Sequence, residues 1–177
     1  MKNSFLLAFI CVIFFSCSVK KIPATAAAHP YEIIMDGQTK ILKGLLNRSI
    51  IENDSSFKWF KINYNLGTVD MPAIAAFEKN ASKFQMVIFG GTWCEDTQNL
   101  LPSFFRLVDK SNYPEKNITL IGVDRNKNTL GNLNNAFHIT NVPTFIVMEN
   151  GKEIARVVEY GKYGKIDREL GEIVSGL

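Results

Sequence analysis

The hydrophobic pattern of the chain first predicts a buried sheet. Two continuous apolar runs, FQMVIFG (84–90) and NITLIGVD (117–124), are typical of central strands that are covered on both faces. Between residues 144 and 160, two further apolar runs, TFIVMEN and KEIARVVEY, lie on either side of a glycine and predict an antiparallel hairpin. A second hairpin is predicted in residues 31–46, where two short extended runs meet at an Asp-Gly turn.

Helical periodicity occupies the segments between these strands. Residues 69–80 begin with an N-cap aspartate and a proline, both of which favour the start of a helix. A long helix is predicted from about residue 94 to residue 110, and Pro102 should kink it. A short helix is predicted in residues 129–139, and an amphipathic helix in residues 164–177 should close the chain.

The segment from residue 47 to residue 65 is less regular, and helices are favoured there. Ser49 followed by Glu52 has the spacing of a capping box, which is a start signal for a helix. The same segment holds the densest aromatic cluster of the chain, and we expect it to pack onto the sheet rather than to bind a partner. The cluster consists of Phe57, Trp59, Phe60 and Tyr64.

The order of these elements predicts an α/β fold with a central mixed sheet and helices on both faces. The two apolar strands lie on either side of the long helix and should therefore be parallel. The hairpin at residues 144–160 should add antiparallel strands to them.

The first 30 residues are expected to lie outside this fold. Residues 1–17 combine a lysine near the start with an apolar run that is too short to span a bilayer, as in an export signal. The ending FFSC resembles a bacterial lipoprotein processing site, at which Cys17 would be lipidated, whereas ATAAAHP (24–30) suits ordinary signal cleavage. Residues 18–30 have the composition of a tether. We therefore expect an exported protein of the cell envelope, anchored in the membrane through Cys17 and facing the periplasm.

Composition and charge narrow the range of partners. The chain has 20 basic and 17 acidic residues and no long basic block, which disfavours nucleic-acid binding. Of its three cysteines, Cys11 leaves with the signal and Cys17 is lipidated or removed, so Cys94 would be the only free thiol of the mature protein. His29 and His138 lack the spacing of metal ligands, and we predict neither a metal site nor a cofactor.

Three motifs in a fixed order carry a family resemblance. A buried strand, GTWC at the start of a proline-containing helix, and NVPTF opening a hairpin about fifty residues later resemble a thioredoxin. The resemblance covers residues 70–177 and implies a three-layer thioredoxin-like fold, to which residues 31–69 add an N-terminal extension. It also implies that Pro143 is the cis-proline that lies against the active-site loop. VDRNKN resembles the thiol-reducing thioredoxins of bacterial envelopes, although Asp124 and Arg125 are expected to be a helix cap and a surface ion pair.

The resemblance makes Cys94 the attacking cysteine of a C-x-x-C motif, but Thr97 stands in the second cysteine position. Glu95 and Asp96 lie between them on the rim of the site, where the family often has a neutral pair. The helix start favours a thiolate, and the Thr97 hydroxyl can donate to it. The two carboxylates disfavour it, so we expect a thiolate less favoured than beside a neutral pair. Ile88 replaces a buried polar residue that is frequent in the family.

Two functions remain open at this point. In the favoured one, Cys94 exchanges with protein or small-molecule thiols and disulfides, and an external thiol resolves the mixed disulfide. Trp93 would cover the sulfur, and the backbone of Val142 and Pro143 would dock an extended peptide. In the alternative, the protein is a redox-inactive module that binds peptides or proteins, and Cys94 is a small, partly buried residue.

Overall fold

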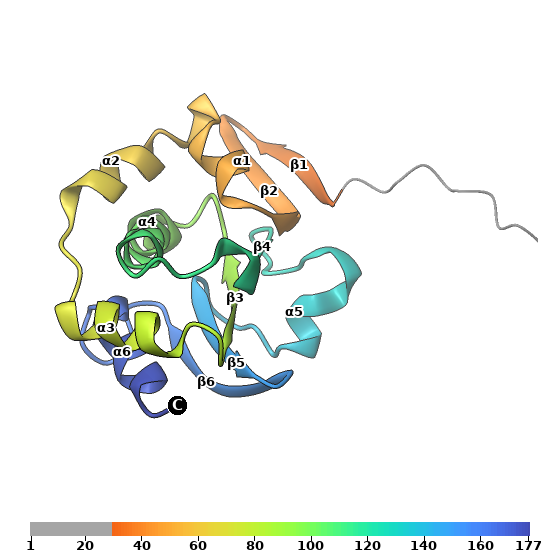
Figure 1. Cartoon of the computed structure of the whole chain (residues 1–177). Helices are drawn as coiled ribbons and strands as arrows, with labels where there is room; N and C mark the ends of the chain where they lie inside the picture. Colours follow the sequence, from red (N-terminus) through yellow and green to blue (C-terminus); the bar gives the residue numbers. More distant parts are fainter. Residues whose placement is uncertain (1–29) are drawn as a thin grey trace, which may run out of the picture.

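The computed structural model describes residues 30–177 of the chain. The predicted signal, the lipidation of Cys17 and nearly all of the tether fall outside the described residues. Within them, one six-stranded sheet runs through the middle of the molecule in the order β1-β2-β4-β3-β5-β6 (Figure 1). None of the helices described is long and apolar enough to cross a membrane.

The secondary structure agrees with the predicted order of elements. The strands are β1 (Tyr31–Asp36), β2 (Thr39–Leu46), β3 (Gln85–Gly90), β4 (Ile118–Gly122), β5 (Thr144–Glu149) and β6 (Lys152–Val158). The α-helices are α1 (Arg48–Glu52), α2 (Trp59–Leu66), α3 (Met71–Asn80), α4 (Glu95–Lys110), α5 (Leu133–Ala136) and α6 (Ile166–Ser175). Short 3-10 turns are η1 (Ser55–Phe57), η2 (Glu115–Asn117) and η3 (Leu130–Asn132).

The two apolar runs are the central strands of the sheet. Strand β3 pairs in parallel with β4 and antiparallel with β5, and α4 connects β3 to β4. Each edge of the sheet belongs to a hairpin, β1–β2 at one side and β5–β6 at the other. The predicted parallel pair, both hairpins and the mixed sheet are therefore confirmed.

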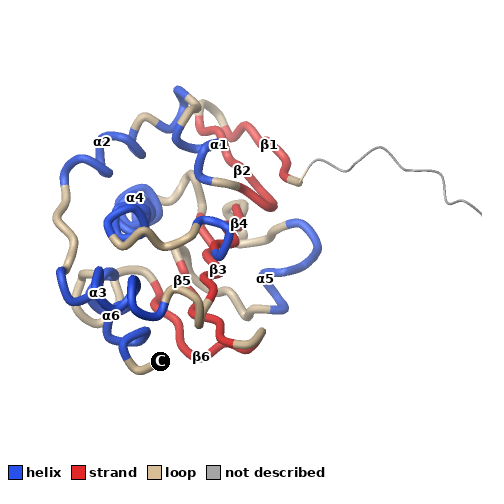
Figure 2. Tube along the Cα trace, viewed as in Figure 1, coloured by secondary structure: helices blue, strands red, loops and turns tan. Residues whose placement is uncertain are grey.

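Side chains of the sheet enter two apolar cores, because successive residues of a strand point to opposite faces. On one face, Met86 and Ile88 of β3 pack in a large core to which α2, α3, α4 and α6 contribute. On the other face, Phe89 and Ile146 form a smaller core with Phe137, which follows α5. Figure 2 shows these helices on the two sides of the red strands, so the prediction of helices on both faces is confirmed.

Side chains at the predicted helix starts confirm one cap and correct another. The carboxylate of Asp70 accepts a hydrogen bond from the Ala73 N–H at 3.1 Å, as expected of the N-cap of α3. Helix α1 begins one residue before Ser49, so the predicted capping box is wrong. The cap is Asn47, whose side-chain oxygen accepts from the Ile50 N–H and from the Ser49 hydroxyl.

The aromatic cluster joins the N-terminal extension to the rest of the molecule. Phe57 and Phe60 are buried in the large core, and Trp59 packs against it partly exposed. The ring of Phe60 lies 5.9 Å from that of Phe105 in α4, measured between centroids. The predicted packing role of the cluster is confirmed.

Candidate active site at the start of helix α4

Cys94 lies directly before α4 and occupies its N-cap position. Its N–H donates to the Gly91 carbonyl at 2.9 Å, and its carbonyl accepts from the Gln98 N–H at 3.0 Å. The side chain is half-buried. Because the first N–H groups of a helix have no partner within the helix, they surround this position with partial positive charge. The sulfur therefore lies where a negative charge is tolerated and where a reagent can reach it.

The loop before β5 lies against this sulfur. The Val142-Pro143 peptide bond is cis, as the resemblance implied. The Cys94 thiol donates a hydrogen bond to the Val142 carbonyl, with 3.2 Å between sulfur and oxygen. The loop is held in turn from β6, since the Glu159 N–H donates to the Pro143 carbonyl at 2.8 Å. The thiol and the predicted peptide-docking backbone are thus in direct contact.

Trp93 is fixed beside the sulfur by its neighbours. Its indole N–H donates to the Val123 carbonyl at 3.0 Å, and the guanidinium of Arg125 lies 5.4 Å from its ring centroid. Arg125 is also paired with Asp36, the last residue of β1 before the hairpin turn. A Cβ atom on Gly91 would come within 2.7 Å of the indole ring, so the ring can lie this close to the loop only because residue 91 is a glycine. Arg125 is therefore part of the rim as well as of a surface ion pair.

Thr97 and the two carboxylates occupy the first turn of α4. Thr97 is buried, and its hydroxyl oxygen accepts from the Gly91 N–H at 3.2 Å. Within residues 30–177 no hydrogen bond joins Thr97 to Cys94, so Thr97 supports the loop in front of the sulfur rather than the sulfur itself. Glu95 is exposed and Asp96 is half-exposed. Acidic residues at this place complement the helix dipole.

The remaining sequence candidates lie apart from this chemistry. His138 is exposed and has a positive φ of 52° in the turn after α5. Ile88 is fully buried in the large core. In the part of the chain that the structure describes, no group of three or more His, Cys, Asp or Glu side chains is arranged to hold a metal ion.

Sequence reasoning missed Thr92, which lies two residues before Cys94. Its hydroxyl accepts from the Leu42 N–H at 3.1 Å and donates to the Lys40 carbonyl at 3.0 Å. Both partners belong to β2, about fifty residues earlier in the chain. No local pattern marks a threonine for such a role.

Comparison with known proteins agrees with this geometry. The family model for thioredoxin matches residues 71–171. The chain belongs to the thioredoxin family. Thioredoxin H2 from Arabidopsis thaliana is 28% identical to it over 95 residues, a match that covers 54% of this chain and 66% of that protein. The β1–β2 hairpin and helices α1 and α2 lie before the part that the family model matches.

Two solved structures are similar to parts of the chain. The oxidized state of thioredoxin O2 from Arabidopsis thaliana is 21% identical, with a TM-score of 0.39, and the match covers 59% of this chain and 83% of that one. The reduced form of thioredoxin 2 from Pseudomonas aeruginosa PAO1 is 24% identical, with a TM-score of 0.39, and the match covers 62% of this chain and 95% of that one.

Proposed function

We propose that this thioredoxin-family protein is a thiol-disulfide oxidoreductase that works through Cys94 alone. The position of the sulfur carries the proposal. Cys94 is half-exposed at the start of a 16-residue helix and contacts the carbonyl that precedes Pro143. A nucleophile there meets a disulfide in a peptide that lies along the loop, with Trp93 beside it.

The reaction has two exchange steps. In the first, the Cys94 thiolate attacks one sulfur of the substrate disulfide, the S–S bond breaks, and the other sulfur leaves as a thiolate that takes up a proton. In the second, an external thiolate attacks the substrate-side sulfur of the mixed disulfide, and Cys94 leaves as a thiolate. The external thiol is joined to the substrate in a new disulfide, which a further thiol reduces. Thr97 takes no covalent part, since a hydroxyl forms no disulfide.

In this proposal the Val142 carbonyl takes part both in docking of the peptide and in formation of the attacking thiolate. The Cys94 thiol donates to the Val142 carbonyl, which is also the group that an extended peptide would use as a ladder acceptor. Ionisation of the thiol removes its donor and frees the carbonyl. Formation of the nucleophile and docking of the peptide would therefore favour each other.

We also propose that the protein works in the cell envelope, anchored through a lipidated Cys17 and facing the periplasm. The support is the N-terminal segment of residues 1–17, which has a lysine near its start, then an apolar run, and ends in FFSC. The test is the mass of the mature protein isolated from membranes of a bacterial host. A chain that begins with acylated Cys17 supports the proposal, and a chain that begins between residues 24 and 30 contradicts it.

A second function has its own support. Thr97 in the second cysteine position and the acidic pair Glu95 and Asp96 favour a redox-inactive module that binds extended peptides at Trp93 and Pro143. The two functions differ in whether the Cys94 sulfur is nucleophilic near neutral pH.

The deciding experiment is alkylation of residues 18–177 by iodoacetamide over a range of pH, with Cys94→Ser as the blank. At pH 7 the folded protein should react about fivefold faster than the same chain unfolded in urea, because the N–H groups at the start of α4 stabilise the negative sulfur that attacks the reagent. A peptide disulfide should then give one stable mixed disulfide per molecule, which persists until an external thiol is added. A folded thiol that reacts more slowly than the unfolded one would leave the binding module as the function.

A further inference from the structure

Strand β2 is longer than its pairing with β4, and this leaves part of its backbone without a strand partner on the side that faces β4, although β1 pairs along its other side. The two strands pair only over Gly44–Leu46. Lys40 and Leu42 therefore extend past the end of β4. A Cβ on Gly122, the last residue of β4, would lie 2.2 Å from the Leu42 carbonyl oxygen, so the two backbones are in close contact at this end.

The hydroxyl of Thr92 satisfies the free backbone groups of β2. It accepts from the Leu42 N–H at 3.1 Å and donates to the Lys40 carbonyl at 3.0 Å, which uses it as both acceptor and donor. Thr92 is only 4% exposed. A single side chain thus replaces a piece of β-ladder at the place where β4 has ended. Without it, polar backbone groups of β2 would be buried and unpaired, which is unfavourable.

The backbone of Thr92 is also bonded to the first turn of α4. Its carbonyl accepts from the side-chain amide of Gln98 at 2.9 Å, and the Gln98 N–H donates to the Cys94 carbonyl. The Gly91 N–H donates to the Thr97 hydroxyl, and the Gly91 carbonyl accepts from the Cys94 N–H. The loop that carries the thiol is therefore held between β2 and the first turn of α4.

Two ion pairs from the hairpin reach the rim of the same site. Lys43 of β2 pairs with Asp124 at 2.9 Å, and both side chains are less than one-fifth exposed. Asp36, the last residue of β1, pairs with Arg125, whose guanidinium lies over the Trp93 ring. Three separate contacts thus run from the hairpin to Thr92 in the thiol loop and to Asp124 and Arg125 after β4.

We propose that the β1–β2 hairpin is a working part of the thiol site and that Thr92 is the positioning residue through which it acts. The proposal rests on the proposed function in that it concerns the same thiol. Thr92 touches no reacting atom. It fixes the loop from Gly91 to Cys94 against β2, and this keeps the sulfur at the helix start and in contact with Val142.

The test compares Thr92→Val, which keeps the shape and removes the hydroxyl, with Thr92→Ser, which restores it. Thr129→Val is the matched control, because Thr129 is 7% exposed and its hydroxyl also donates to a backbone carbonyl, that of Gly122, at 2.8 Å. All three are made in the full chain. The first measurement is NMR: hydrogen exchange of the Leu42 amide and the Cβ chemical shift of Cys94. The second is the rate at which Cys94 forms a mixed disulfide with a peptide disulfide.

In Thr92→Val, the Leu42 amide should exchange about tenfold faster, the Cys94 signal should shift, and mixed-disulfide formation should slow about fivefold, as expected for the loss of two neutral hydrogen bonds. Thr92→Ser should return both rates to within about twofold of the native chain. Thr129→Val should change neither the Cys94 signal nor the rate, although it also removes a buried hydrogen bond.

The two proposals fail in different ways. If native Cys94 does not react with the peptide disulfide, the proposed function fails, and the NMR signals still decide the role of Thr92. The positioning role is overturned if Thr92→Val leaves the Cys94 signal unchanged. It is also overturned if Thr129→Val moves that signal equally, or if Thr92→Ser fails to restore it.

Discussion

The two halves of the N-terminal extension contact the thioredoxin part of the chain at different places. The β1–β2 hairpin contacts the loop that carries Cys94, through Thr92 and the rim residue Arg125. Helices α1 and α2 contact α4 chiefly farther from the thiol, through packed aromatic rings and the largely buried Arg48, although Asn63 of α2 also donates to the Gln98 carbonyl at 2.9 Å. The hairpin therefore contacts the loop that carries the thiol, whereas the helices mainly contact the body of α4.

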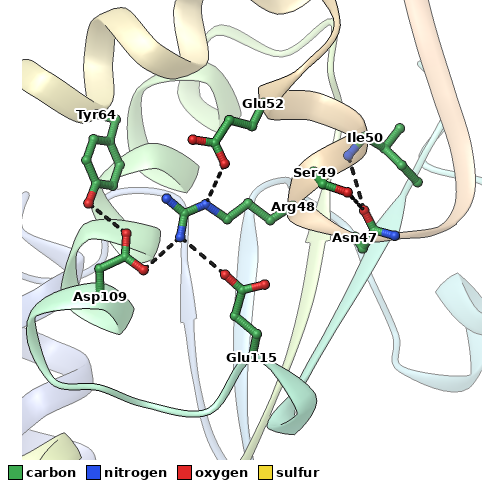
Figure 3. Close-up of polar contacts among 8 residues, drawn as sticks. All are labelled: Asn47, Arg48, Ser49, Ile50, Glu52, Tyr64, Asp109 and Glu115. Atoms are coloured by element: carbon green, nitrogen blue, oxygen red, sulfur yellow. Dashed lines mark hydrogen bonds and ion pairs between the residues drawn. The ribbon is translucent and has the colours of Figure 1, made fainter.

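The helical half is held by a charge network that is centred on Arg48 (Figure 3). The guanidinium donates to Glu52 at 3.0 Å, to Asp109 at 2.7 Å and to Glu115 at 3.2 Å. The Tyr64 hydroxyl donates to the second oxygen of Asp109 at 2.7 Å. Burial alone would lower the pKa of Arg48, but these hydrogen bonds and charges outweigh it and raise the pKa. A largely buried cation is stable there because three carboxylates pair with it.

The distance between these two regions decides what each can influence. Asp109 is fifteen residues after Cys94 along α4, which corresponds to about 22 Å at 1.5 Å per residue. Changes in the Arg48 network should therefore alter the stability of the protein and leave the thiol as it is. Changes in the hairpin should alter the thiol at a small cost in stability.

Among the tests of this comparison, Arg48→Met is expected to lower the free energy of unfolding most. Methionine keeps the apolar stem and removes the charge, which leaves Asp109 and Glu115 without their cation. The Arg48 side chain is 13% exposed, but its three partners Glu52, Asp109 and Glu115 are 31%, 35% and 56% exposed and can be hydrated. We expect the free energy of unfolding to fall by about 1–3 kcal/mol, measured by urea denaturation.

Arg168→Met is the control for that change. Arg168 and Glu172 are both about half-exposed, so the loss should stay below about 0.5 kcal/mol. The alkylation rate of Cys94 per folded molecule should be native in both variants. A changed rate in Arg48→Met would mean that the helical half also reaches the site, and the division between the two halves would be wrong.

A smaller loss of stability is expected at acidic pH. Burial alone would raise the pKa of Asp109 and of Asp124, but hydrogen bonds from Arg48 and Tyr64 to the first, and from Lys43 to the second, lower both pKa values below the ordinary 3.8. A carboxyl whose pKa is lower in the folded state adds stability that is fully present above its unfolded pKa. That stability is lost as the pH falls through the folded pKa.

Urea denaturation at pH 6 and at pH 3 measures this effect. The free energy of unfolding should fall between the two pH values, by less than Arg48→Met costs at pH 6. Asp109→Asn should flatten the fall, because the amide does not titrate in this range. If Asp109→Asn loses stability with acid as steeply as the native chain, the pairing with Arg48 is not the source of the acid sensitivity.

The smallest change in stability is expected from Arg125→Ala in the hairpin contact. Arg125 and Asp36 are both about half-exposed, so the loss should be below about 0.5 kcal/mol. The local effect should still be visible, because the guanidinium covers the Trp93 ring. In a Trp59→Phe background, acrylamide should quench Trp93 fluorescence more strongly after the substitution. Quenching equal to that of the Trp59→Phe protein with Arg125 intact would show that the Arg125 contact does not shield the Trp93 ring.

Local patterns predicted the framework of the site correctly. The apolar run that ends at Gly90 is the central strand, and α4 begins next to Cys94 as expected. Such signals succeed because period, caps and turns act within a few residues. The error at α1 is also a matter of a few residues. Asn47 caps the helix instead of Ser49, because only the backbone geometry shows which polar residue lies outside the first turn.

The sequence by itself determined the fold class, the strand and helix order and the place of the one thiol in the described part of the chain. It did not determine what surrounds that thiol. The Cys94 contact with Val142 joins residues 48 positions apart, and the Thr92 contact with Leu42 joins residues 50 apart. The physical reason is register: Thr92 meets free backbone groups only because β4 ends at Gly122 while β2 continues. Where one strand stops beside another is decided by the packing of the whole sheet.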